Sequence, residues 1–144
     1  MFLSGFVHSG SGFLSAVLLA GLLPWGAARA EGAVMEYDVV CIAATGTDQR
    51  LSEDICEGFL QLLRSSYPDR TFTSANHSSR QPRLDILISQ ASGSAAALQL
   101  VWTDRQGVQS HGGIESVSAM DRQLSSSMKQ SLYRQALMAS PLPE

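Results

Sequence analysis

The chain has 144 residues, of which 44% are hydrophobic and only 16% are charged, and its formal net charge is −3 at pH 7. This composition is too apolar and too weakly charged for an intrinsically disordered protein. The length suits one ordinary domain. The slight negative balance, without a clustered cationic surface, predicts no nucleic-acid partner.

Residues 1–30 have the composition of a targeting segment. They contain one formal charge, Arg29, and no acid, and the run FLSAVLLAGLLPW is apolar. A helix of that run spans about 20 Å, short of the roughly 30 Å hydrocarbon core of a bilayer. Ala28 and Ala30 fit the A-x-A pattern, so we predict a signal peptide over 1–30 with cleavage between Ala30 and Glu31. An uncleaved anchor and a buried core helix are the alternatives.

Cleavage of this leader leaves a single predicted domain over residues 31–140 and a frayed tail over 141–144. The mature chain then carries no stable membrane anchor. The expected location is periplasmic or secreted.

The two cysteines, Cys41 and Cys56, both lie in the mature part of the chain. An even count in an oxidising compartment favours a bridge. A helix that returns over its own strand brings the face of Cys41 onto the apolar stripe of Cys56. We predict a disulfide closing a loop of about 15 residues, worth about 3 kcal/mol in the chain-entropy model. Two buried free thiols and a reactive cysteine remain as alternatives.

The first half of the mature chain predicts a strand, a helix and a short edge strand. Residues 36–43 are almost all apolar, which is typical of a centrally placed strand. Ser52 is the predicted N-cap of a helix that runs to about Ser66, and Pro68 ends it. Residues 71–73 are predicted as an edge strand, followed by a polar loop.

Three more strands are predicted in the second half. Alternation over 84–89 and over 98–103 has the period of a strand, and Trp102 is expected to fill the core. A turn then leads into a returning strand over 108–111, which Gly112–Gly113 is expected to end.

The last predicted element is an amphipathic helix. Ser118–Asp121 resembles a capping box, and the helix is expected to end near Ala139, before Pro141. Its apolar residues recur every four positions, at Met120, Leu124, Met128 and Leu132. The element order is β-α-(β)-β-β-β-α, which predicts an α+β two-layer sandwich with two helices on one face of a mostly antiparallel sheet.

No residue is predicted to be catalytic, to bind a cofactor or to ligate a metal. His77 lies in a polar loop and His111 at a strand end, and both are interpreted as surface histidines without a partner at metal-ligand spacing. Asp85 interrupts an apolar strand. We interpret it as a solvent-face residue or as a partly buried acid that pairs with Arg83 or Arg105.

The stretch from Leu84 to Gly113 combines an Asp inside an apolar strand (RLDILIS) with a strand that closes on an Asp-x-x-Gly turn (LQLVWTDRQG). Together with the preceding strand–helix unit and the final helix, this pattern over about 37–137 resembles the periplasmic domain at the amino terminus of TolB and, in related form, CsgG-like secretion proteins. The resemblance implies a β/α sandwich that works in envelope assembly by binding other proteins, not by catalysis. It assigns no functional residue.

We therefore expect an exported protein-binding or accessory module of the bacterial cell envelope, with envelope proteins as its partners. An exposed sheet edge, at 71–73 or 108–111, is expected to accept a partner strand.

Two alternatives belong to other functional classes. A small secreted hydrolase requires a serine, His77 or His111 to converge with a carboxylate. A small-ligand carrier would use the sheet face opposite the helices, where Gln99, Thr103 and Gln109 are expected.

Overall fold

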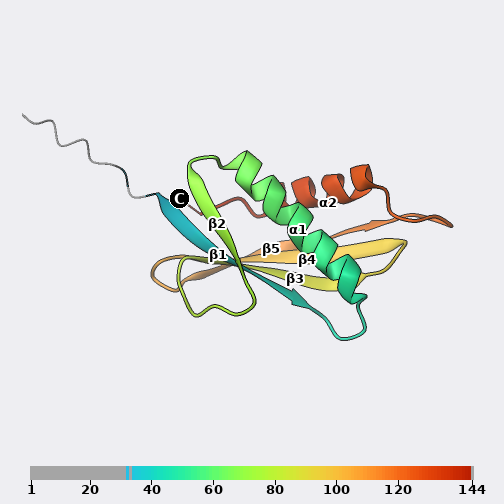
Figure 1. Cartoon of the computed structure of the whole chain (residues 1–144), viewed down its shortest axis with the longest axis horizontal. Helices are drawn as coiled ribbons and strands as arrows, with labels where there is room; N and C mark the ends of the chain where they lie inside the picture. The colour runs from blue at the N-terminus through green and yellow to red at the C-terminus, as the bar shows by residue number, and fades with distance from the viewer. Residues whose placement is uncertain (1–31, 33, 144) are drawn as a thin grey trace, which may run out of the picture. The chain divides into compact units, whose positions relative to one another are not determined.

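The protein is described by a computed structural model that covers residue 32 and residues 34–143 (Figure 1). The predicted leader over 1–30 and its cleavage site between Ala30 and Glu31 lie outside these residues. The elements are β1 (Met35–Ala43), α1 (Gln49–Ser66), β2 (Arg70–Ala75), β3 (Arg83–Ala91), β4 (Ala95–Thr103), β5 (Gln109–Ser118) and α2 (Ser126–Ala139). The α+β class and the predicted element order are confirmed.

The five strands form one sheet in the order β2-β1-β3-β4-β5. The pairs β1·β2 and β1·β3 are parallel, whereas β3·β4 and β4·β5 are antiparallel. The sheet is therefore mixed rather than mostly antiparallel. The cause is the β1–α1–β2 crossover, because two parallel neighbours cannot be joined by a short turn. Both helices cover the same face of the sheet (Figure 1).

The core lies between that face and the two helices. Helix α1 packs on β1, β2 and β3, and α2 packs on β4 and β5. The alternating residues of β3 and β4 are fully buried, as the sequence pattern predicts: Leu84, Ile86, Ile88, Leu98, Leu100 and Trp102. No helix within the described residues has the length and apolarity needed to cross a membrane.

Helix α1 begins three residues before the predicted N-cap. Asp48 caps it, because its Oδ1 accepts a hydrogen bond from the Leu51 N–H at 3.0 Å. The predicted cap, Ser52, lies one turn inside the helix. Its hydroxyl donates a hydrogen bond to the Asp48 carbonyl at 2.8 Å, and the side chain is buried. Asp48 satisfies the helix terminus as well as serine would, so composition alone did not decide between them.

Strand β5 continues past Gly112–Gly113, so the prediction that these glycines end it is wrong. The strand bulges there, because Gly112 and Gly113 together oppose Leu100 of β4. A Cβ on Gly112 would lie 2.6 Å from the Cβ of Ser140. The glycine is therefore required by the close approach of the segment that follows α2.

Helix α2 starts later than the capping-box pattern predicts. Ser118 is the last residue of β5, and Asp121 has a φ of 55°, which is incompatible with a helical first turn. The true N-cap is Ser125, whose hydroxyl accepts from the Met128 N–H at 3.3 Å. Met120 consequently lies off the packed helix face and is 91% exposed.

Candidate functional site

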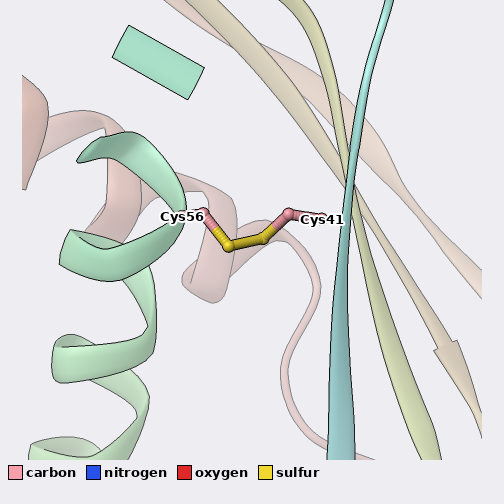
Figure 2. Close-up of a disulfide and its surroundings, with 2 residues drawn as sticks. All are labelled: Cys41 and Cys56. Carbon is pink, nitrogen blue, oxygen red and sulfur yellow. A yellow bond between two sulfur atoms is a disulfide. The ribbon is translucent and has the colours of Figure 1, made fainter. Parts of the chain in front are cut away.

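A disulfide joins Cys41 of β1 to Cys56 of α1, with the two Cα atoms 6.1 Å apart (Figure 2). The predicted bridge is confirmed. It fastens the amino-terminal turns of α1 to the central strand of the parallel part of the sheet. Both cysteines are only partly buried, because they face a hollow between α1 and the strand ends.

This hollow, which we call the α1–β2 groove, has a volume of about 680 Å³. It opens where the parallel strands β1 and β2 end, the position at which open α/β sheets commonly bind ligands. Its buried floor consists of Leu60, Ile88 and Ser52, with the disulfide forming part of the wall. Its exposed rim comprises Gln49, Glu53, Glu57, Arg64, Ser74 and Asn76.

The rim on α1 is charged. Glu53 and Glu57 lie one helical turn apart, on the same side of α1. The side-chain amide of Gln49 donates to Glu53 Oε1 at 2.9 Å. Within the described part of the chain, neither glutamate takes part in an ion pair. The two carboxylates therefore leave a local negative charge along the amino-terminal part of this bank, and Arg64 lies farther along α1.

The opposite bank is the free edge of β2, which is paired only with β1 among the described residues. The Arg70 N–H bonds outside the sheet, to the Tyr67 carbonyl at 3.1 Å. The Phe72 carbonyl accepts from Arg64 Nη2 at 3.0 Å. Backbone N–H and C=O groups alternate in direction along a strand. These two contacts therefore indicate that the backbone groups of the even-numbered residues of β2 point away from β1. Ser74 is the next such residue.

The other face of the sheet carries a buried polar network at one end. Arg83 Nε forms an ion pair with Asp85 Oδ1 at 3.0 Å, and Arg83 Nη1 donates to the Ser78 carbonyl at 2.6 Å. The Ser78 hydroxyl in turn donates to the buried carboxylate of Asp38. Asp85 is therefore the ion-paired acid of the second interpretation, although it is buried rather than partly buried, and its partner is Arg83, not Arg105. The network fastens the loop after β2 to the sheet.

The polar face predicted for a ligand carrier is only partly polar. Gln109 is exposed and Gln99 half-buried, while the Thr103 hydroxyl is buried with no hydrogen-bond partner in the described residues. Ile42 and Ile114 are exposed beside Gln99 and border a hollow of about 240 Å³. The larger hollow lies on the helix side of the sheet, not on this face.

The two histidines lie far from each other in the fold. His77 follows β2 at one edge of the sheet, and His111 lies within β5 at the other edge rather than at a strand end. Both are exposed, and neither lines the α1–β2 groove. No histidine ion pair is present among residues 34–143. Nor do any three His, Cys, Asp or Glu side chains of the described residues gather as a metal site.

Sequence reasoning missed the α1–β2 groove. Its lining comes from α1, from three strand ends and from the turn after β1, and no two of these segments form a recognisable motif. Glu53 and Glu57 have the appearance of an ordinary solvated helix flank. The one available signal was the position of the groove, beyond the end of a strand followed by a helix.

No protein-family model and no curated protein sequence matches the chain. Among solved structures, the chain is similar to a PelC variant from Paraburkholderia phytofirmans that was solved as a dodecamer. The match has a TM-score of 0.56 and 16% sequence identity, and it covers 72% of this chain and 86% of the PelC chain. At this identity the similarity establishes a shared fold.

Proposed function

We propose that this chain is an exported module of the bacterial cell envelope that acts by binding another protein in the α1–β2 groove. The observation that carries the proposal is that the apolar part of the α1–β2 groove lies beside the free edge of β2. Cys41, Cys56 and Ala75 offer accessible apolar surface above the buried Leu60 and Ile88, and β2 offers unpaired backbone groups beside it. Extended protein segments bind at sites with these two properties.

Export is supported by two independent features. The apolar leader over 1–30 ends in a signal-peptidase pattern. The disulfide between Cys41 and Cys56 is a bond that persists in oxidising compartments and is rare in the cytosol. A periplasmic or secreted location accounts for both.

An envelope role is supported by the resemblances of the fold. The sequence pattern resembles the periplasmic domain of TolB and CsgG-like proteins, and the fold is shared with PelC, which was solved as a dodecamer. A fold that assembles through protein contacts in PelC suits a module whose role is contact with other proteins.

A small-ligand carrier is the second candidate. The groove volume of about 680 Å³ falls in the range of roughly 300–1,000 Å³ that is usual for small-molecule sites. In this candidate function the ligand would bind in the groove on the helix side of the sheet, beside the disulfide, rather than on the face opposite the helices.

Export is tested by the intact mass of the protein recovered from the cell envelope. We expect a chain that begins at Glu31 and has two hydrogens fewer than the dithiol. Full-length protein in the cytoplasm with Cys41 and Cys56 reduced would contradict the proposal.

Protein binding is tested by placing a photo-crosslinking amino acid at Asn76, on the rim of the groove. The matched control is the same amino acid at Ser116, which is exposed on the opposite edge strand. We expect one discrete crosslinked protein from position 76 and none from position 116. Equal crosslinking from both positions, or none from position 76, would argue against the groove as the binding site.

A further inference from the structure

We infer that the occupant of the α1–β2 groove is an extended segment that adds to β2 at Ser74 and directs basic side chains toward Glu53 and Glu57. This inference rests on the proposed protein-binding function and specifies the chemistry of the partner. Three features support it: the free backbone of β2, the position of Arg64, and the charge of the α1 rim.

The backbone of β2 is available at its carboxyl-terminal end. Outward groups lie on Arg70, Phe72 and Ser74, as the alternation of contacts indicates. The Arg70 N–H and the Phe72 carbonyl already have partners within the chain, whereas Ser74 is exposed and lines the groove. An added strand therefore pairs with β2 at Ser74 and lies directly beside the α1–β2 groove.

Arg64 limits where that strand binds. Its Nε and Nη2 atoms lie 3.3 and 3.0 Å from the Phe72 carbonyl. Charged side chains that occupy edge carbonyls are a common protection of exposed strands. The guanidinium closes the middle of the β2 edge, and the edge beyond it remains open toward Asn76.

The charge of the rim selects the side chains of the occupant. Glu53 and Glu57 face the groove without a cationic partner in the described residues, while the neighbouring Asp54 is paired with Lys129. Alternate residues of an extended segment point to one side. A segment with basic residues at alternate positions therefore directs them to the helix side, toward the acidic bank, while the residues between them point to the opposite face of the sheet.

The test uses the mature chain with its disulfide intact and two pentapeptides that carry a neutral fluorophore at the amino terminus, Val-Lys-Val-Lys-Val-amide and its Glu counterpart. Fluorescence polarisation at low salt is expected to give at least about tenfold tighter binding of the Lys peptide. The double variant Glu53→Gln with Glu57→Gln is expected to remove about that tenfold preference. Glu115→Gln on β5 is the matched control and is expected to leave the affinity unchanged.

Backbone pairing is tested on the peptide, so that the protein is not altered. N-methylation of one alternate set of peptide amides is expected to abolish binding, and N-methylation of the other set to leave it intact, because only one set faces β2. Equal tolerance of both sets, or equal affinity of the Lys and Glu peptides, would overturn the inference.

The two proposals fail in distinguishable ways. A discrete crosslink from Asn76 with no binding of the Lys peptide would refute the basic extended segment and leave the protein-binding function standing. Absence of both the crosslink and the peptide binding would refute the two together.

Discussion

The two halves of this sandwich bury their side chains in different ways. The antiparallel half, β3-β4-β5 with α2, is filled by Trp102 at its centre, and the indole Nε1 donates to the Ser140 carbonyl at 2.9 Å. The parallel half, β2-β1-β3 with α1, leaves a groove of about 680 Å³ and carries the disulfide. A domain of this size has little surplus stability. The covalent bond therefore lies in the half that borders the groove.

A groove for a partner is compatible with the half that carries the disulfide. A filled core tolerates no hollow without a loss of several kcal/mol. A crosslink stabilises without filling space, since in the chain-entropy model it acts on the unfolded chain. Beside the groove, the disulfide between Cys41 and Cys56 adds a covalent link to the packing of Ile55 and Phe59 against the sheet.

The largest effect is expected in the filled half. Trp102→Ala removes a fully buried indole and its hydrogen bond to Ser140. We expect a loss of about 3–5 kcal/mol in the free energy of unfolding, measured by denaturant titration. A loss below about 1 kcal/mol would mean that the filled half is not the main source of packing stability.

The next effect is expected in the crosslinked half. Replacing Cys41 and Cys56 together with alanine is expected to cost about 3 kcal/mol. Amide exchange should rise most in the first turns of α1 and at the end of β1, with α2 and β5 less affected. Uniform acceleration across both halves would contradict the local role of the bond.

A smaller effect is expected where the segment after α2 crosses β5. Gly112→Ala places a Cβ 2.6 Å from the Cβ of Ser140, and overpacking of this kind costs about 1–3 kcal/mol. The neighbouring Gly113→Ala is the control, because its nearest contact is 3.7 Å, to Glu115 Oε1. Equal unfolding free energies for the two variants would show that the close approach is not constraining.

Each half contains one helix with a side chain that caps its amino terminus, so the two caps can be removed by equivalent substitutions. Asp48→Ala and Ser125→Ala each remove one side-chain acceptor at a helix amino terminus, and each is expected to cost about 1 kcal/mol. Only the Asp48 variant should weaken binding in the groove, because Asp48 precedes the rim residues of α1. A similar loss of binding in both variants would contradict that separation.

The seam between the helices is expected to respond to alkaline pH. Burial, and secondarily the negative charge of Asp54, raises the pKa of Tyr133 to about 12 from its usual 10.0. The folded state then retains a proton that the unfolded state loses, so this stabilisation is complete below pH 10 and declines as the pH rises through about 12. Ultraviolet titration of phenolate should show one late-titrating tyrosine that is absent in Tyr133→Phe.

The sequence predicted those parts of the fold that depend on local pattern. The alternation through Leu84, Ile86 and Ile88 identified a strand because one face of it is buried. The disulfide followed from the placement of Cys41 and Cys56 on facing surfaces of a strand and its returning helix. Both inferences required only the spacing of residues within one or two adjacent elements.

The errors arose where distant contacts decide the conformation. Gly112 has the appearance of a strand terminator, yet it is a glycine because Ser140 approaches it from beyond α2. Ser118–Asp121 imitates a helix start, but β5 extends to Ser118 and the chain turns at Asp121. The groove was missed for the same reason, since its lining is assembled by the tertiary fold.

We expect the half of the sandwich that carries the disulfide and the α1–β2 groove to be the half that binds a partner. The direct measurement is amide hydrogen exchange of residues 31–144. The protein is compared alone, with the partner captured from position 76, and with the Lys peptide. We expect new protection at 70–76 and along the rim of α1, with no change at 109–118. Protection confined to 109–118, with 70–76 exchanging as in the free protein, would contradict it.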